Sequence, residues 1–438
     1  MKKVYYQLIL LQKSPLRIGN GGNEVSDSDL MLDQREMPFI PGSSIAGVLR
    51  EIYGKLIARI SGVEEKELFG YIEGEKLYNS HVLVGDAVLP KNAKRDEIHT
   101  TVRNGIGIDE WGVAIQGHKY DFQVTETKIP YISLIEWSGD EAAYEKEVLK
   151  SLDPLMKHIS AEGLLLGART TRGFGSMEVT VRKKVYSFPQ NLDLWLKDDL
   201  RKEGAFPDES TMQKEAFQNM TYQIRVKIKM MGSFSVRVYT ARAEVLEDGS
   251  VPDSLPLKNA DGKPVISGTT WAGVFRHHMQ DVLHQAFRQD PKCVSVYKKV
   301  INRFFGMEET EGEHKRSPLR VSETEIIGGT AYSLTRNAVD RFTQAPRNTS
   351  LFTSQLWQGG EGELELFFSL DSFNDVHKKV LLQLLAITFI DLDLGILPFG
   401  GSTSTGQGRA EIETISVNGT DVKTRLKSQD CHFLEEWI

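Results

Sequence analysis

The sequence contains little of what several common classes of functional site require. Only two of its 438 residues are cysteine, Cys293 and Cys431, which is too few for a disulfide framework or a cysteine-rich zinc knuckle. No run approaches the roughly 18 apolar residues that a transmembrane helix needs. The first residues lead directly into a strand-like pattern without the small-residue cleavage site of a signal peptide. These absences favour a cytoplasmic protein that does not associate with membranes.

The usual nucleotide-binding and hydrolase motifs are also missing. No GxxxxGK[ST] sequence occurs, and the glycine-rich stretches follow helix-like patterns and precede strand-like ones, the reverse of a dinucleotide fingerprint. The sequence has no Gly-x-Ser-x-Gly elbow and no HxxxH or CxxC spacing. We therefore expect neither a P-loop enzyme, nor a serine hydrolase, nor a structural zinc site.

The overall composition is that of an ordinary globular protein, with 40% hydrophobic and 26% charged residues. A chain of 438 residues exceeds what one hydrophobic core usually serves, so two domains are expected. The net charge of −7 argues mildly against indiscriminate binding to nucleic acid. Any nucleic-acid site on this chain must therefore be a local basic groove.

The sequence repeats itself. Residues 38–50 read PFIPGSSIAGVLR and residues 264–276 read PVISGTTWAGVFR, with seven of thirteen positions identical at an offset of 226. Three further pairs of segments follow in the same order: Leu68-Phe69-Gly70 with Phe304-Phe305-Gly306, Arg103-Asn104 with Arg336-Asn337 (each with an Asp close behind, Asp109 and Asp340), and Leu164–Gly175 with Leu397–Gly408. This order indicates a duplicated domain with small insertions.

Each copy has the same expected element order. A strand opens it (3–11 and 222–230), a helix follows the PGSS or SGTT turn, and strands and a long excursion come next (92–130 and 307–352). A second helix (140–159 and 373–390) and a last strand (176–185 and 409–417) close it. The order β-α-β-β-α-β predicts an α+β fold of two ferredoxin-like domains, residues 1–185 and 220–417, with a linker at 186–219 and a tail at 418–438.

The turn and helix shared by the copies form the first candidate site. Hydroxyls and free N–H groups at a helix start can bind an anion, although such hydroxyls more often cap the helix. Retention of the whole set in both copies favours binding. The candidate residues are Ser43, Ser44 and Arg50 in the first copy and Thr269, Thr270 and Arg276 in the second.

The loop before this turn contains five carboxylates in the first copy. Only Asp27 meets another acid, Asp253, when the offset of 226 is applied, and each is followed by a serine. The duplication thus singles out one acid of five as a candidate for chemistry. An Asp-Ser pair in a loop is also common as a simple Asx-turn.

The glycine-rich loops and the long excursions are the remaining candidates. Glycines there can permit a tight turn or let backbone N–H groups approach phosphates, and on glycine content alone the turn is favoured. The excursions mix basic, hydroxyl and aromatic residues, which is typical of hairpins that touch a polyanion. The residues concerned are Arg172, Gly173, Gly175, Gly406 and Gly408 in the loops, and Arg103, Asn104, Arg336 and Arg341 in the excursions.

Together, the PGSS-x-x-G-x-x-R helix, the arginine-containing excursion and the Gly-x-Gly loop resemble the RAMP superfamily of CRISPR proteins. The likeness is to backbone subunits of type III effector complexes, here as a tandem of the type III-D kind. The resemblance implies modified RRM-like domains that grip a guide RNA through the helix, the loops and the arginines named above. It also implies that the excursions are thumb hairpins that wedge into the guide–target duplex, with other subunits of the complex as partners.

The family's cleaving aspartate lies in the loop before the PGSS helix, at the positions of Asp27 and Asp253. The resemblance therefore implies cleavage of target RNA at two sites by metal-assisted attack of a 2′-OH, with a divalent cation, expected to be Mg²⁺. The second copy departs from the pattern at Ser267 and Trp271. An alternative is that both domains only scaffold guide RNA. A guide-processing nuclease and a small-molecule enzyme rank lower, because no paired histidine or catalytic cluster is present.

Overall fold

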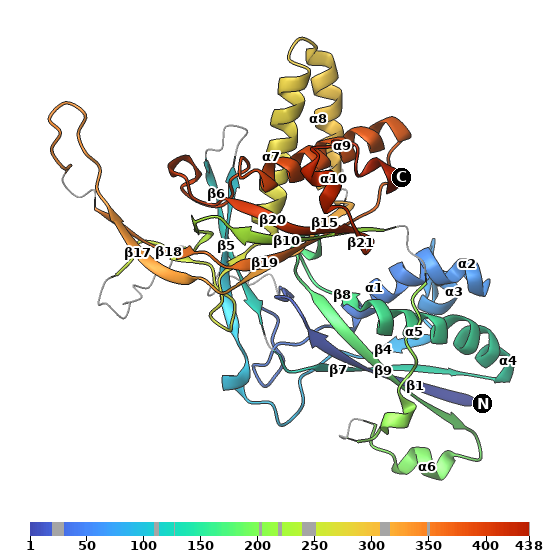
Figure 1. The fold of residues 1–438 in the computed structure, drawn as a ribbon. Coiled ribbons are helices and arrows are strands. Elements are labelled where there is room, and N and C mark those ends of the chain that lie inside the picture. Colours follow the sequence, from blue (N-terminus) through green and yellow to red (C-terminus); the bar gives the residue numbers. More distant parts are fainter. Residues whose placement is uncertain are drawn as a thin grey trace. The chain divides into compact units, whose positions relative to one another are not determined.

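The computed structural model describes residues 1–19, 30–108, 114–126, 128–200, 204–217, 221–238, 251–306, 316–347 and 351–437. Backbone contacts divide the chain into two units. The first comprises Met1–Val102, Asp121–Thr170 and Phe174–Asn219, and the second Arg103–Tyr120, Thr171–Gly173 and Met220–Ile438. Parts of the first copy's hairpin and glycine-rich loop thus belong to the second unit. Figure 1 shows the elements of both units.

The first unit is built on an antiparallel sheet in the order β4-β7-β1-β9-β8. Its strands are β1 Lys2–Gln12, β4 Val82–Val84, β7 Tyr131–Gly139, β8 Leu164–Leu165 and β9 Ser176–Ser187. Along β1, the alternating residues Val4, Tyr6, Leu8 and Leu10 are fully buried, because side chains of a strand point to opposite faces in turn. The order of β4, β7, β1 and β9 is that of a ferredoxin-like sheet, as the sequence predicts.

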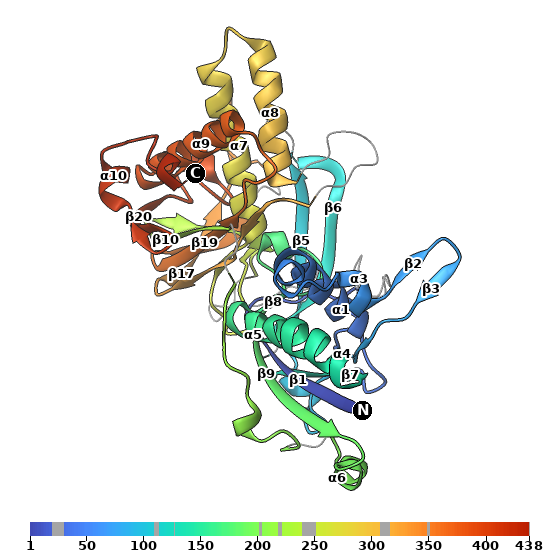
Figure 2. The ribbon, with the colours of Figure 1, turned by 90° about the vertical axis from the view of Figure 1, so that its right-hand side faces the viewer.

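Helices cover the face of this sheet that carries the core (Figure 1). They are α1 Gly42–Ile52, the π-helix η1 Tyr53–Ile57, α2 Ala58–Ser61 and α3 Glu65–Phe69, then α4 Glu141–Ala143, the π-helix η3 Tyr144–Leu152 and α5 Asp153–Glu162. Two hairpins leave the sheet, β2–β3 (Tyr71–Glu73, Lys76–Tyr78) and β5–β6 (Thr100–Ile108, Ala114–Thr125). Figure 2 shows β2–β3 projecting from the helices.

The second unit repeats the arrangement, with β16, β19, β10 and β20 in the order of β4, β7, β1 and β9. Its main strands are β10 Tyr222–Met230, β15 Leu319–Val321, β16 Thr324–Ile327, β19 Glu361–Phe368 and β20 Ala410–Val417, with β14 Val265–Ile266 and β21 Thr420–Asp421 at the edges. Its helices are α7 Gly268–Ala286, α8 Pro291–Phe305, α9 Asp375–Asp393 and α10 Lys423–Lys427. The sequence predicted α7 and α9 but not α8, which runs beside α7 (Figure 1). No helix among the described residues is both long and apolar enough to cross a bilayer.

The segment between the copies, predicted as a linker at 186–219, packs on the first unit. Its helix α6 (Leu192–Lys197) lies near Tyr5, Tyr186 and Phe206, which form a small buried cluster. Two basic side chains of β9 bind this segment. Arg182 donates to the carbonyl of Phe206 at 3.2 Å, and Lys184 forms an ion pair with Asp198. The segment is therefore part of the first unit's structure.

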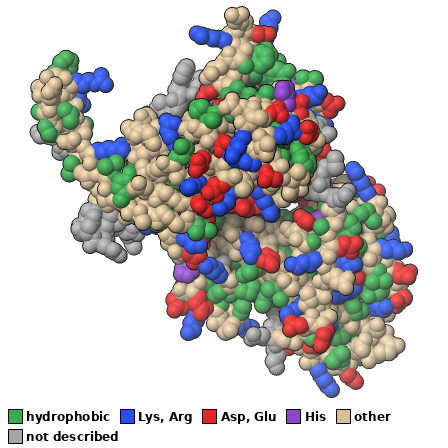
Figure 3. Space-filling view, viewed as in Figure 1, with side chains coloured by type: hydrophobic (Ala, Val, Ile, Leu, Met, Phe, Trp, Pro, Cys, Tyr) green, Lys and Arg blue, Asp and Glu red, His purple; other side chains and the backbone are tan. Residues whose placement is uncertain are grey.

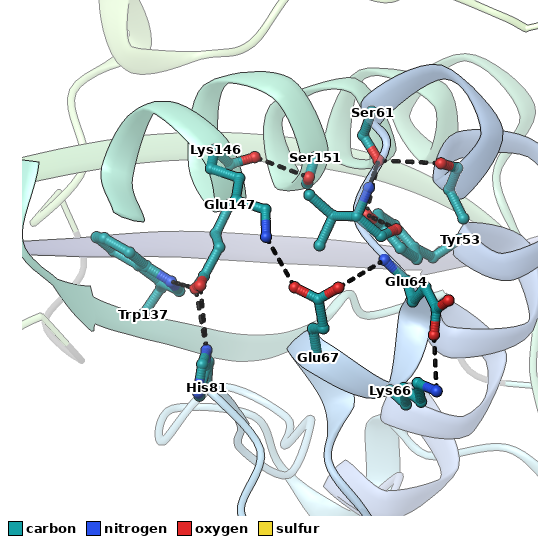
Figure 4. A network of polar contacts seen from close by, with 12 residues as sticks. Tyr53, Ser61, Glu64, Lys66, Glu67, His81, Trp137, Lys146, Glu147 and Ser151 are labelled. Carbon is teal, nitrogen blue, oxygen red and sulfur yellow. Dashed lines mark hydrogen bonds and ion pairs between the residues drawn. The ribbon is translucent and has the colours of Figure 1, made fainter. Parts of the chain in front are cut away.

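A polar network fastens η3 to the rest of the first unit (Figure 4). The indole N–H of Trp137 donates to Glu147 at 2.8 Å, and His81 Nδ1 lies 3.1 Å from the same carboxylate. The neighbouring Lys146 binds Glu67 of α3 at 2.8 Å, which lowers the pKa of Glu67. Because Trp137 is fully buried, its N–H depends on Glu147 for a partner.

This dependence gives a stability prediction. Glu147→Ala removes the only acceptor that the Trp137 indole has in this network and should lower the free energy of unfolding by about 1–3 kcal/mol. Glu145→Ala, at an exposed position of the same helix, is the control and should change it by less than about 0.5 kcal/mol. Urea denaturation measures both. Equal losses in the two variants would contradict the role given to Glu147.

Candidate functional site

The helix start that the copies share is capped differently in each. Gly42 N–H donates to Asp86 Oδ1 at 2.7 Å, and the residue before it, Pro41, makes no side-chain cap. In the second copy Ser267 replaces that proline, and its hydroxyl accepts the Thr270 N–H at 3.2 Å. The alternative role of Ser43 and Ser44 as helix caps is not seen, because they lie inside the first turn of α1 and Asp86, which follows β4, accepts the first N–H of the helix.

The first glycine of each helix is required by a strand that crosses it. A Cβ at Gly42 would lie 2.2 Å from the carbonyl oxygen of Val84, and one at Gly268 would lie 2.5 Å from that of Val321. Real Cβ atoms do not approach so closely. The PG and SG dipeptides of the motif thus fix the helix against β4 and β15.

One face of each helix carries a hydroxyl, a glycine and an arginine in line. Ser43, Gly47 and Arg50 are spaced i, i+4 and i+7, as are Thr269, Gly273 and Arg276, so each set lies on one stripe. Ser43, Gly47 and Thr269 are exposed. A Cβ at Gly47 or Gly273 would have no neighbour within 4 Å in the part of the chain that the structure describes. Neither of these two glycines is needed by the packing of the chain.

The arginines that end the two stripes have different surroundings. Arg50 Nε lies 3.3 Å from Glu65 Oε1 at a partly exposed position. Arg276 Nη2 lies 3.1 Å from His277 Nε2, and burial lowers the pKa of Arg276 below its ordinary value. An arginine still stays protonated at neutral pH. The positive charge is thus present in both stripes, more solvated in the first.

The two glycine-rich loops are the same structure. Gly175 N–H donates to the carbonyl of Pro15 and Gly408 N–H to that of Ser233, both at 2.8 Å. Each glycine would place a Cβ 1.8 Å from the carbonyl oxygen across the loop, that of Leu166 or Phe399. Gly175 and Gly408 therefore serve the turn itself. Gly406 differs, because a Cβ there would meet open space.

The hydrogen bonds also fix the register of the acidic loop. Met31 N–H donates to Ile18 and Leu257 N–H to Val236 at 2.8 and 2.7 Å, which places residue 31 on residue 257 at the offset of 226. Leu30 and Pro256 then bridge to Gly19 and Arg237 in the same way. The offset that pairs Asp27 with Asp253 holds to within three residues of both. Asp27 itself lies outside the described residues.

Asp253 is exposed and is held by the second strand of the hairpin. Its N–H donates to the carbonyl of Thr353 at 2.8 Å, and its Oδ2 accepts the Thr353 N–H at 2.7 Å. The next residue, Ser254, forms a bridge to Ser354. The second carboxylate oxygen, Oδ1, has no hydrogen-bond partner among the described residues. Asp253 is thus positioned by backbone contacts with one oxygen left for another group.

The hairpin arginines of the two copies lie in different surroundings. Arg103, on β5, is only 3% exposed and lies 3.8 Å from Glu323, both within the second unit. That burial gives Arg103 an ion-pairing role and does not suit direct contact with RNA. Asn104 next to it is partly exposed, and Asp109 lies outside the described residues. Arg336 is exposed, and its Nη1 lies 3.4 Å from the Thr405 hydroxyl of the glycine-rich loop.

In the second hairpin, β17 (Thr330–Arg336) and β18 (Phe352–Gln358), the residues that follow β17 form a turn around Asp340. Asp340 accepts the N–H groups of Thr343 and Phe342 at 2.9 and 3.0 Å, and these bonds lower its pKa. They hold Phe342 outward with 96% of its surface exposed, beside the exposed Arg341. Figure 3 shows hydrophobic and basic side chains together on this projection. An exposed aromatic ring beside cations suits stacking on a base.

The loop arginine of the first copy has a packing role. Arg172 Nη2 donates to the carbonyl of Phe305 at 2.6 Å, and Gly173 would place a Cβ 2.6 Å from the Glu323 nitrogen, both within the second unit. Arg237 was not predicted, yet it reaches Ser402 of the second glycine-rich loop. No sequence signal distinguished it. Among the described residues, no group of three His, Cys, Asp or Glu side chains could hold a metal ion.

The two kinds of glycine in these helices give a paired prediction. Gly42→Ala and Gly268→Ala bring a methyl group onto a strand carbonyl and should each destabilise the chain by about 1–3 kcal/mol. Gly47→Ala and Gly273→Ala meet open space in a helix and should instead stabilise it by up to about 1 kcal/mol. Thermal unfolding of the four variants measures this. The same sign in both pairs would show that the helix starts are not seated as described.

A comparison with protein-family models gives one match, described as the RAMP superfamily, over residues 12–178 and 226–411. The two segments cover more than half of the chain and fall on the two copies. No curated protein matches the chain.

Proposed function

Because the chain belongs to the RAMP superfamily, which supports a CRISPR-associated RNA-binding role, we propose that its two copies bind guide RNA as consecutive backbone units of an effector complex. In this proposal the other subunits of the complex and a target RNA are its partners. The tandem, type III-D-like arrangement and the cleavage of target RNA belong to the same proposal.

The observation that carries the proposal is the duplicated stripe of hydroxyl, glycine and arginine. Glycine inside a helix costs about 1 kcal/mol relative to alanine. Gly47 and Gly273 both carry this cost, and no neighbouring atom of the described residues explains it. A ligand backbone that passes close to the helix does explain it, with the helix N-terminus and the exposed hydroxyls of Ser43 and Thr269 facing its phosphates.

The charge of the chain is compatible with such a site. The net charge of −7 leaves room for local positive charge, and each stripe supplies one arginine, Arg50 in the last turn of α1 and Arg276 in the middle of α7. Binding through phosphates would weaken steeply as salt is raised. The second hairpin adds Arg341 and Phe342 as a stacking and charge contact.

The stripe gives a binding prediction. Gly273→Leu fills the open space above α7 with a strong helix former, so the fold should persist while affinity for single-stranded RNA falls by tenfold or more, about 1.4 kcal/mol. Gln285→Leu, exposed and three turns further along α7, is the matched control and should bind RNA normally. Fluorescence anisotropy at fixed salt measures both. Unchanged RNA affinity in Gly273→Leu would remove the stripe from the interface.

For the chemistry, we propose that Asp27 and Asp253 promote cleavage of target RNA at two places. A 2′-OH oxygen attacks the adjacent phosphorus and the bond from phosphorus to the 5′-oxygen breaks. The leaving 5′-oxygen takes a proton from water, which gives a 2′,3′-cyclic phosphate and a 5′-OH end. The carboxylate takes the proton of the 2′-OH, and Oδ1 of Asp253 is the oxygen left for this. A divalent cation, expected to be Mg²⁺, would stabilise charge on the phosphate. A single carboxylate with RNA oxygens suits Mg²⁺, which commonly keeps one or two protein ligands.

The cleavage proposal is tested by Asp27→Asn and Asp253→Asn, singly and together. Asparagine can still accept the Thr353 N–H, so binding should persist while each single variant loses one product, with its rate reduced about 10²-fold or more. Gel analysis of a labelled target RNA with the assembled complex separates the products. An unchanged product pattern in the double variant would leave the guide-RNA scaffold as the function.

A further inference from the structure

A short piece of the first copy's glycine-rich loop is part of the second unit. Thr171–Gly173 belong to that unit, as does Arg103 of the first hairpin. The carbonyl oxygen of Arg172 would lie 2.4 Å from a Cβ at Gly268, the first residue of α7. The guanidinium group of Arg172 donates to the carbonyl of Phe305 at 2.6 Å. The loop therefore covers the start of α7 with its backbone and with one side chain.

An acidic residue of the second unit completes this contact. Glu323 Oε2 lies 3.8 Å from Arg103 Nη2, and the backbone nitrogen of Glu323 would lie 2.6 Å from a Cβ at Gly173. Only 10% of the Glu323 side chain and 2% of Phe305 are exposed. Gly268, Phe305 and Glu323 together are called the loop-binding surface of the second copy.

The first copy has an equivalent surface. Gly85 and Ser322, which directly follow β4 and β15, each donate a backbone hydrogen bond of 2.9 Å to the next strand of their sheet. The residue after Gly85, Asp86, is therefore the equivalent of Glu323. The repeat in the sequence supplies the other two members, so the loop-binding surface of the first copy consists of Gly42, Phe69 and Asp86.

This surface of the first copy is more exposed than its counterpart. The three atoms nearest to a Cβ at Gly42 all belong to Val84 and Gly85 of the same copy. Asp86 is exposed, although its Oδ1 accepts the Gly42 N–H, and Phe69 is half-buried. Among the described residues, the first copy thus has the loop-binding surface without the loop that covers it in the second.

We propose that the loop-binding surface of the first copy binds the glycine-rich loop of another protein subunit with this fold. A contact between unlike faces of two equivalent domains can be repeated by a third domain. The occupant carries an arginine followed by a glycine. Its backbone lies on Gly42, its arginine donates to the carbonyl of Phe69, and Asp86 pairs with a basic residue of its hairpin. The proposal rests on assembly with other subunits, which the proposed function includes, and needs no RNA.

A second copy of this chain is a poorer occupant, because its other loop lacks the arginine. Gly175 and Gly408 close the two loops in the same way, so Thr405 stands where the first loop has Arg172. Thr405 has no guanidinium group, and its hydroxyl donates to the carbonyl of Ser402 at 2.8 Å within its own loop. The occupant is therefore a different subunit with an arginine in its loop.

Docking of this loop leaves the stripe of hydroxyl, glycine and arginine accessible. In the second copy Thr269 is exposed although the loop lies against the residue before it, Gly268. Ser43 stands in the same relation to Gly42 and is also exposed. A helix start can therefore hold a loop on its first residue and contact RNA through the next.

Site-specific crosslinking tests which molecule lies on this surface. A photo-crosslinking amino acid replaces Asp86 in a tagged chain, which is purified from its native cells with the subunits that it binds. After irradiation, mass spectrometry should identify a crosslinked peptide of another subunit that contains an arginine followed by a glycine in a glycine-rich loop. The same amino acid in place of Glu145, an exposed residue of η3, is the control and should not yield that peptide.

The other crosslinking outcomes contradict the proposal. Crosslinks from position 86 to RNA alone, to residues 402–407 of a second copy of this chain, or to no other molecule would each overturn it. RNA affinity is measured separately by anisotropy, so the docking proposal can fail while the proposed RNA binding stands, and the reverse.

A conservative variant gives a second test that does not depend on the bulky substitution. Asp86→Asn can still accept the Gly42 N–H, so its melting temperature should equal that of the unaltered chain. It loses the charge that pairs with a basic residue, so the yield of the co-purified subunit should fall by about threefold or more. An unchanged yield would overturn the role of Asp86 and with it the proposed surface.

Discussion

The structure depends on one main-chain crossing that occurs twice. The glycine-rich loop passes over the continuation of the first strand, and within the loop a Cβ at Gly175 or Gly408 would lie 1.8 Å from the carbonyl oxygen of Leu166 or Phe399. The N–H groups of the two glycines bond to Pro15 and Ser233, and the strand continues from there toward the acidic loop and the base of the hairpin. The continued strand then pairs with the base of the hairpin in each copy, and in the second copy the hairpin strand holds Asp253. A methyl group at either glycine would disturb this arrangement.

Much of the fold could be predicted because the domain is duplicated, so that most strand and helix patterns occur twice in the sequence and can be compared. The strand at 222–230 and the closing helices and strands lie where periodicity places them, within a few residues. The offset of 226 was found on the turn and helix and holds for the backbone pairing of Leu30 and Pro256. A pattern that recurs in both copies at the same spacing predicts the backbone structure, because the two copies share one fold.

The sequence was less informative where a long-range partner decides a side chain's role. Asp86 caps α1 from 44 residues away, and no local pattern indicates it. Arg103 aligns with Arg336, yet it is buried beside Glu323 while Arg336 is exposed. Gln355 Oε1 is buried without a hydrogen-bond partner among the described residues because Pro256 stands where the first copy has the N–H of Leu30. The burial of a side chain and its hydrogen-bond or ion-pair partners depend on the tertiary structure. A matching sequence motif therefore does not predict them.

The two copies are therefore equivalent in backbone and different in chemistry. The stripe of hydroxyl, glycine and arginine is common to both, whereas the position of the buried Phe122 on the hairpin strand of the first copy is occupied by Ser354 in the second.

The proposed function requires both helix stripes to contact one RNA strand. Photo-crosslinking tests this with a chain in which Cys293 and Cys431 are replaced by serine, and a single cysteine carrying the crosslinker is placed at Ser43 or at Thr269. Each position is expected to crosslink to the bound RNA, at two sites on the same strand separated by a constant number of nucleotides. Crosslinking from neither position, or from only one, would contradict it.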